Sequence, residues 1–241
     1  MFMADILTFD VWADYAHFKK YYTTTSPLTF SIPPKTVIYG IVGAIIGLGK
    51  EEYLEYFSPG SCKVGIGINK PIKKIRVPMN LIDTKKARLM SRIDNRTQIR
   101  TELLKDIEYR IYFSHVDEKI YEDLKGKLQQ HKSYYTVSLG LSEHLADFKY
   151  RGEYKIDRVE DNQNWHTFQT ALRIDGNNLN KGDIYFTEDK EYFADKIAIE
   201  MKPDREVTDY GRVVFERTGQ EIEAKPRSFY HLETGESIIL L

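Results

Sequence analysis

Residues 33–48 read PPKTVIYGIVGAIIGL and include the longest apolar run of the chain, about 12 residues from Val37 to Leu48. Proline can occupy the first turn of a helix because its φ is already close to the helical value, so this stretch predicts a helix from about Lys35 to Leu48. Small residues recur on one face of that helix, at Gly40, Gly43, Ala44 and Gly47. Each glycine costs about 1 kcal/mol in a helix relative to alanine, so we expect compensation from close packing against a sheet. A membrane span needs about 18 apolar residues, so the run indicates a core helix and no membrane partner.

Alternating apolar residues predict strands on both sides of this helix. The segments are 5–12, 63–69, 107–113 and 134–139, with a second helix expected over 117–130. The resulting order is strand, helix, strand, insertion, strand, helix, strand, which is the βαββαβ order of ferredoxin-like and RRM domains. We therefore expect an α+β fold in which residues 1–145 form an RRM-like domain with a basic insertion at about 71–105.

The pattern changes in the C-terminal part of the sequence. From about residue 146 the helical periodicity disappears, and short alternating runs are separated by turn signals at 175–178 and 218–219. There is no Gly/Ser-rich linker between the two parts. The pattern predicts that residues 146–241 form a smaller β-rich region packed on the first domain.

Charge is unevenly distributed although the net charge of the 241 residues is only −1. Residues 63–110 carry 13 Lys and Arg against 5 Asp and Glu, a net charge of +8, and the segments on either side are acidic. A basic island between acidic flanks produces a directed field that attracts polyanions. The alternative is an ordinary solvated surface.

Several function classes lack their sequence signals. Cys62 is the only cysteine, which excludes an intrachain disulfide and indicates a reducing, cytoplasmic location. The acidic N-terminus does not resemble an export signal. The six histidines show no metal-binding spacing, and Gly49-Lys50 lacks the remaining residues of a phosphate-binding loop. We therefore expect neither a metal nor another cofactor.

The basic insertion is the strongest candidate for a binding site. Its arginines recur every four residues, at Arg88, Arg92, Arg96 and Arg100. That spacing places them on one face of a helix, and equally on one face of a hairpin folded at Asp94-Asn95. With Arg76 before them and Met90 between them, they would hold a phosphate backbone and press apolar atoms against a base. The alternative is a solvated helix, although few acidic residues lie nearby to pair with the arginines.

A second candidate is the segment 19–36, which combines cations, tyrosines and hydroxyls with the start of the Gly-rich helix. Hydroxyls and a helix N-terminus can bind phosphate or 2′-hydroxyl groups, and we expect Lys35 to recognise a particular RNA terminus. The alternative is that the Thr and Ser residues before the prolines are plain turn residues. The candidate RNA contacts in this segment are Lys19, Lys20, Tyr22, Thr23, Thr24, Thr25, Ser26, Lys35 and Thr36.

Three blocks of the sequence carry a family resemblance. They are YYTTTSPLTFSIPPKTVIYGIVGAIIG, RTQIRTELLKDIEYRIYF and SLGLSEHLADF, in that order within residues 1–150. Together they resemble the fifth family of CRISPR-associated (Cas) proteins in its type I-B form. The resemblance implies an RRM-like RAMP subunit of the antiviral Cascade complex, which grips the 5′ handle of the CRISPR RNA. It also implies a thumb at about 71–105 and contacts with the adjoining backbone subunit and the large subunit.

Two other functions remain open. The type I-C branch of the same family cleaves precursor RNA without metal, using a Tyr, Lys and His set. Here Lys35 stands where that Tyr is expected, Asp117-Glu118-Lys119 replaces the Lys-His pair, and His131-Lys132 lies at the far end of the second helix. Because acid–base catalysis requires groups placed together, we expect RNA binding without cleavage and no enzymatic activity. A protein-only scaffold is the third possibility.

Overall fold

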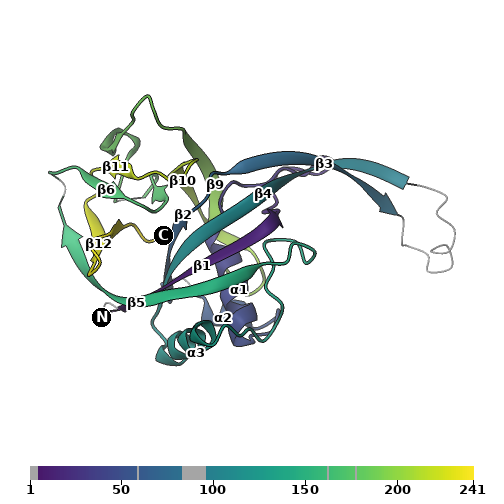
Figure 1. Cartoon of the computed structure of the whole chain (residues 1–241), viewed down its shortest axis with the longest axis horizontal. Helices are drawn as coiled ribbons and strands as arrows, with labels where there is room; N and C mark the ends of the chain where they lie inside the picture. Colours follow the sequence, from purple (N-terminus) through teal and green to yellow (C-terminus); the bar gives the residue numbers. More distant parts are fainter. Residues whose placement is uncertain (1–4, 59, 83–95, 162, 177) are drawn as a thin grey trace.

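The computed structural model describes residues 5–58, 60–82, 96–161, 163–176 and 178–241 (Figure 1). In these residues a seven-stranded antiparallel sheet runs in the order β13-β12-β5-β1-β4-β2, and β3 pairs with β4 outside that path. Its central part, β5-β1-β4-β2, has the strand order of ferredoxin-like domains and confirms the predicted α+β fold. The strands are β1 (Asp5–Ala16), β2 (Cys62–Ile68), β3 (Lys73–Ile82), β4 (Arg96–His115), β5 (Asp147–Glu160), β12 (Ser228–Leu232) and β13 (Ser237–Ile238).

Three helices pack on one face of the sheet (Figure 1). They are α1 (Lys35–Ile46), α2 (Tyr53–Tyr56) and α3 (Glu118–Gln129), so both long helices lie where the sequence predicts them. Phe9 of β1, Ile111 of β4 and Leu124 of α3 belong to the same buried cluster. The opposite face is covered in part by the C-terminal strands, where Ile6 and Tyr112 pack against Leu232.

The expected strand at 134–139 is wrong. The fourth strand of the fold is β5, which pairs with β1 on the side away from β4 and lies beyond the predicted domain boundary at residue 145. The backbone amides of Tyr134 and Tyr135 instead donate to the carbonyls of Ile45 and Ala44, at the end of α1. The last carbonyls of a helix have no partner inside the helix, and this segment supplies donors for two of them.

The predicted packing of the small-residue face of α1 is also wrong. The face of α1 that enters the sheet-side core carries Ile38, Val42 and Ile45, because branched side chains bury more apolar area than glycine. A Cβ on Gly43 would lie 3.2 Å from the Cβ of Tyr53 in α2, so Gly43 allows the two helices to approach closely. Gly47 has a φ of 94° and ends the helix in the left-handed conformation.

The C-terminal part is rich in strands, as expected, and has its own apolar cluster around Phe168, Val214 and Phe229. Two three-stranded sheets, β7-β10-β9 and β6-β11-β8, form in its described residues, and the division into residues 1–145 and 146–241 stays a prediction. Their strands are β6 (His166–Phe168), β7 (Leu172–Arg173), β8 (Ile184–Tyr185), β9 (Tyr192–Met201), β10 (Val207–Glu216) and β11 (Ile222–Ala224); a 3-10 turn covers Lys181–Asp183.

Two ion pairs join β9 to the N-terminal part. Lys35 at the start of α1 is 3% exposed, and its Nζ lies 2.7 Å from Oε1 of Glu200, whose Oε2 accepts a hydrogen bond from Tyr39. Lys20 pairs with Asp195 at 2.7 Å. Burial lowers the pKa of Lys20, but the hydrogen bond and charge of Asp195 more than offset this and raise it. Both cations are thus bound to the C-terminal region.

We expect Lys35→Met to lower the free energy of unfolding by about 3–5 kcal/mol, because it leaves the Glu200 carboxylate without its cation in a largely buried position. The double variant Lys35→Met/Glu200→Met should recover most of that loss. Denaturant unfolding of the purified chain measures both effects. The matched control is Lys202→Met, which breaks an exposed pair with Glu206 and should change the free energy of unfolding far less. Equal losses for Lys35→Met and Lys202→Met would contradict the argument.

Candidate nucleic-acid interface

A two-stranded ribbon projects from the body of the molecule (Figure 1). It is formed by β3 and the first half of β4, which pair without interruption from Lys73 opposite Lys105 to Ile82 opposite Arg96. We call residues 73–82 and 96–105 the thumb. The predicted insertion between the second and third strands is therefore a hairpin, as one of the two sequence interpretations expected. The expected turn at Asp94-Asn95 lies outside the described residues.

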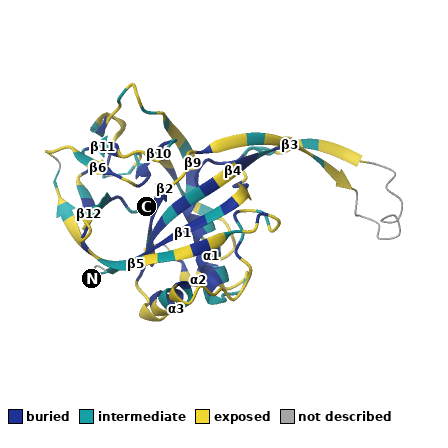
Figure 2. Ribbon diagram, viewed as in Figure 1, coloured by how far each residue is buried: buried dark blue, intermediate teal, exposed yellow. Residues whose placement is uncertain are grey.

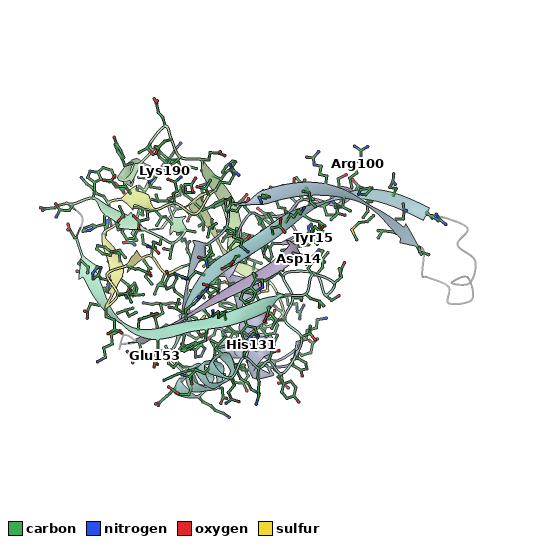
Figure 3. The ribbon with its side chains drawn as sticks, in the orientation of Figure 1. Asp14, Tyr15, Arg100, His131, Glu153 and Lys190 are labelled. Atoms are coloured by element: carbon green, nitrogen blue, oxygen red, sulfur yellow. The ribbon has the colours of Figure 1, made fainter. Side chains whose placement is uncertain are left out.

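The thumb has two chemically different faces, because residues directly opposite each other in an antiparallel pair point to the same side. Arg76, Arg96 and Arg100 share the first, the basic face, with Lys74, Pro78, Asn80, Ile82, Gln98, Glu102 and Leu104. The second, the apolar face, carries Ile75, Val77, Met79, Leu81 and Ile99, together with Leu103, Thr97 and Thr101, and it ends at the base of the ribbon with Lys73 and Lys105. The three arginines are exposed, and four of those apolar residues are half-buried (Figure 2). Figure 3 labels Arg100 on this ribbon, far from the helices.

The basic face keeps its positive charge. Lys74 lies 3.5 Å from a carboxylate oxygen of Glu102, but no ion pair forms between Arg76, Arg96 or Arg100 and any other described residue. Of the remaining predicted contacts in the insertion, Arg88, Met90 and Arg92 lie outside the described residues and stay predictions. The described part of the thumb therefore presents three arginines on one side of a narrow ribbon.

A loop from a distant part of the sequence packs beside the basic face. Thr29 accepts a hydrogen bond from Lys74 Nζ through its carbonyl and donates one to the Glu102 carboxylate through its amide. The preceding residues 19–26, which we call the 19–26 loop, are held by an isolated bridge between Lys19 and Thr29. The structure thus brings together the two segments that the sequence predicts as RNA contacts.

Aromatic rings are exposed on this loop. Tyr21 and Tyr22 are 56% and 61% exposed, and their ring centroids lie 5.2 Å apart. The ring centroid of Tyr210 in β10 lies 5.1 Å from the ring centroid of Tyr21, and Lys196 Nζ lies 5.6 Å from the Tyr210 ring centroid. Exposed aromatic rings beside cations are the surfaces on which single-stranded bases stack. Tyr21, Lys196 and Tyr210 are not among the contacts predicted from the sequence. For the last two no local signal existed, because β9 and β10 reach this position only through tertiary packing.

The predicted role of Lys35 and Thr36 does not fit the structure. Both residues are buried, and Lys35 is bound to Glu200, so the start of α1 is not open to an RNA terminus. The reason is that β9 covers this end of the helix. Lys20 is likewise paired with Asp195, and the Thr23 hydroxyl bonds the backbone of the loop at Lys20 and Leu28. The exposed members of the predicted set are Lys19, Tyr22, Thr24, Thr25 and Ser26.

His115 and His131 lie at opposite ends of α3. His115 is buried, with Nε2 3.0 Å from the Tyr56 carbonyl and Nδ1 accepting from the Asp117 amide. His131 is exposed and bonds Asp147. The intervening helix has 12 residues, or about 18 Å at 1.5 Å per residue. In the structure, as in the sequence, the full length of α3 separates His131 from the residues that precede the helix.

The described part of the chain contains neither a candidate metal cluster nor a membrane-spanning helix. Its His, Cys, Asp and Glu residues form no group of three or more that could hold a metal ion. None of its helices has the length and apolar character needed to cross a membrane.

Comparisons with known proteins agree on one group. A family model described as CRISPR-associated protein (Cas_Cas5) matches residues 6–170. No curated protein matches the sequence. A crystal structure of a CRISPR protein from Archaeoglobus fulgidus is similar over 97% of this chain and 98% of that chain, with 13% identity and a TM-score of 0.56.

Two chains of larger assemblies are also similar. A chain of a CRISPR RNA-guided surveillance complex matches with 10% identity over 91% of each chain and a TM-score of 0.53. A chain of a type III-B Cmr-beta complex bound to target RNA matches with 12% identity over 91% of this chain and 86% of that chain, with a TM-score of 0.51. At these identities the structures show a shared fold, and the family follows from the sequence match over more than half of the residues: the chain belongs to the Cas5 family of CRISPR-associated proteins.

Proposed function

We propose that the chain is a non-catalytic, RNA-binding subunit of a CRISPR effector complex and that it grips the 5′ handle of the CRISPR RNA. The observation that carries the proposal is the basic face of the thumb, where Arg76, Arg96 and Arg100 are exposed and unpaired among the described residues. Like charges on a narrow ribbon repel each other, and a phosphate backbone would neutralise them. The planar guanidinium group can also bind a phosphate through two parallel hydrogen bonds.

The RNA would continue from the basic face onto the 19–26 loop. Thr29 touches Lys74 and Glu102 of the basic face, so the phosphate-binding and base-stacking surfaces are adjacent. In this arrangement the arginines hold phosphates while Tyr21 and Tyr22 stack on unpaired bases. Phosphate contacts position the strand, and the loop supplies contacts with the bases.

The proposal extends to the assembly and its biological role. Membership of the Cas5 family, together with a fold shared with a chain of an RNA-guided surveillance complex, supports a subunit that works with other proteins. The apolar face of the thumb, with Leu81 48% exposed, fits contact with an adjoining backbone subunit. We propose further that this complex is a type I-B Cascade in the cytoplasm and that it serves antiviral defence. The second neighbour of the chain in it would be the large subunit.

The positions of the titratable residues support binding without cleavage. Lys35 is engaged by Glu200, and both ring nitrogens of His115 lie within hydrogen-bond distance of backbone groups. His131 lies at the other end of α3 with Asp147. A general acid and base must lie within reach of the same phosphate and 2′-hydroxyl, and these residues are far apart.

Replacing Arg76, Arg96 and Arg100 together by Ala should weaken RNA binding and reduce its dependence on salt. Each lost phosphate contact lowers the log-log salt slope by about 0.7 for a single strand, so the slope should fall by about 2. Fluorescence anisotropy with a labelled handle RNA at several salt concentrations measures this slope. Lys119, Lys132 and Lys155, which are exposed on α3, after α3 and on β5, give a control triple Ala variant with the same charge change. Equal slopes for the two variants would show that the thumb is not the binding site.

Replacing Tyr22 by Ala should weaken binding of the same RNA by about 1–3 kcal/mol, because the stacking surface for one base is lost. The salt slope should stay unchanged, since no charge is removed. Tyr22→Phe keeps the ring and should bind as the unaltered protein does. If Tyr22→Phe is as weak as Tyr22→Ala, stacking is not the contribution of this residue.

Precursor repeat RNA should remain intact when it is incubated with the pure chain without metal. Denaturing gel electrophoresis over several hours tests this expectation. Cleavage at one position in the repeat that is lost in His115→Ala or His131→Ala would overturn the non-catalytic proposal and favour the ribonuclease alternative.

A further inference from the structure

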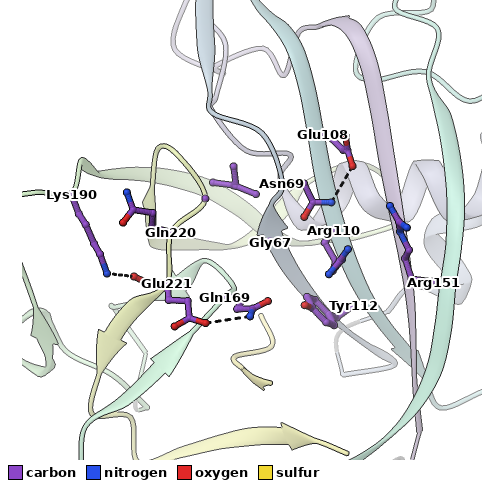
Figure 4. A pocket seen from close by; sticks show the side chains of 12 residues that line it. Gly67, Asn69, Glu108, Arg110, Tyr112, Arg151, Gln169, Lys190, Gln220 and Glu221 are labelled. Atoms are coloured by element: carbon purple, nitrogen blue, oxygen red, sulfur yellow. Dashed lines mark hydrogen bonds between the residues drawn. The ribbon is translucent and has the colours of Figure 1, made fainter. Parts of the chain in front are cut away.

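A polar pocket of about 660 Å³ lies between the large sheet and the C-terminal region, on the side of the sheet opposite the helices (Figure 4). Arg110 of β4 and Arg151 of β5 form one wall. The other wall comes from Gln169, Lys190 and the 217–221 loop that follows β10 (Figure 4). Asn69 at the end of β2 also lines the pocket, four residues before the thumb begins. The pocket therefore adjoins the base of the thumb without including any residue of the interface described above.

The arginine wall is built on a buried carboxylate. Asp10 of β1 is fully buried and accepts hydrogen bonds from Nε of Arg110, at 2.9 Å, and from Nε of Arg151. Burial raises the pKa of Asp10, but the hydrogen bonds and charge of the two arginines more than offset this and lower it, so the group stays ionised. One carboxylate thus holds two guanidinium groups side by side and leaves a net positive charge.

A break in strand pairing places Arg151 on this wall. Thr8 lies opposite Gly152 and Phe9 lies opposite Tyr150, so Arg151 is an extra residue in β5 with no counterpart in β1. Such a bulge re-aims a side chain, and here it turns Arg151 towards Asp10. Among the described residues, Arg151 uses only its Nε for hydrogen bonding, so its two Nη groups are available to a ligand.

The opposite wall is held in a fixed shape as well. The Glu216 carboxylate is 2% exposed and accepts hydrogen bonds from the Thr218 amide and hydroxyl and from the Gln220 amide. Gly219 has a φ of 86°, and a Cβ there would lie 2.1 Å from the Ile68 carbonyl, so this loop can press against β2 only with glycine. Lys190 donates to the Glu221 carbonyl and not to a carboxylate.

The acids on the pocket lining already have partners. Glu108 pairs with Lys70 at 3.1 Å and accepts from Asn69, and Glu221 accepts from Gln169. On the lining itself, the three cations Arg110, Arg151 and Lys190 outnumber the two acids, so the pocket favours an anion. The amide side chains of Gln169 and Gln220 face it from the other wall and can bond a sugar or a base edge (Figure 4).

We propose that this pocket binds one nucleotide of the RNA strand where the strand leaves the thumb, with the phosphate on Arg110 and Arg151 and the sugar or base against the Gln169 and Lys190 wall. The inference rests on the proposed RNA binding and adds a second site to it. Burying carboxylates is costly, and two of them, Asp10 and Glu216, are used to hold the walls of one open pocket. A preorganised pair of arginines binds a phosphate at a lower entropic cost than mobile side chains would.

The test neutralises one phosphate at a time in the handle RNA by methylphosphonate substitution and measures the affinity of each RNA. The unaltered protein should bind about tenfold more weakly when the phosphate at one particular position is neutralised. This position should differ from the positions whose neutralisation no longer matters in the thumb triple variant. In Arg151→Met the same RNA should bind as the all-phosphate RNA does. Arg110 remains to pair with Asp10 in this variant, and thermal unfolding checks that it folds.

A second variant guards against misfolding. Lys190 contacts no buried carboxylate, and Lys190→Met should weaken RNA binding severalfold without changing the unfolding temperature. The first contrary outcome is that neutralising each phosphate weakens the binding of Arg151→Met and Lys190→Met by the same factors as the binding of the unaltered protein. In that case the pocket is not a nucleotide site, although the thumb still binds RNA. If no RNA binds at all, the proposed function fails as well. A third outcome is that adenosine 5′-monophosphate binds the unaltered protein but not Arg151→Met, while both proteins give the same affinities for the series of neutralised RNAs. This outcome would assign the pocket to a free nucleotide and overturn the inference.

Discussion

The buried ion pair between Lys35 and Glu200 joins the C-terminal region to the start of α1, beside the apolar core that Ile197, Ile199, Val213 and Phe215 share with the N-terminal strands. An ammonium group that is 3% exposed must have a close anionic partner, and among the described residues Glu200 of β9 is that partner. With β9 fixed on α1, Asp195 meets Lys20 and β10 follows as its antiparallel neighbour. Tyr210 of β10 then lies beside Tyr21, and the loop after β10 reaches β2 to form a wall of the polar pocket.

Charged residues divide into two groups by their surroundings. Lys35, Asp10 and Glu216 are buried and fully engaged, and each fixes the position of a neighbouring element. Arg76, Arg96 and Arg100 are exposed on a projecting ribbon, where a charge adds little to stability and remains available to a partner. This division explains why a positively charged side chain has a structural role at one position and is a candidate RNA contact at another.

The two faces of the thumb also have different uses. A hairpin that projects from a domain has little core of its own, so a half-buried apolar face and an exposed basic face on the same ribbon favour two different neighbours. A protein surface can cover the apolar face while RNA lies along the basic face. A subunit with this arrangement can hold a strand at the boundary between itself and an adjoining protein.

The sequence by itself determined the fold class, both long helices and the presence of a basic insertion, because apolar periodicity and the clustering of charge are local properties of the chain. It also identified the arginine spacing that places Arg96 and Arg100 on one face. Tertiary structure decided the rest. Residues 134–139 alternate as a strand does, but the free carbonyls of α1 take their amides, and β5 takes the expected place in the sheet. Lys35 has the local signature of an exposed cation at a helix start, and it is buried because Glu200, 165 residues away, lies against it. Partners that distant in sequence leave no local pattern, so the pairing of Asp10 with Arg110 and Arg151, and the polar pocket they line, became visible only in the folded chain.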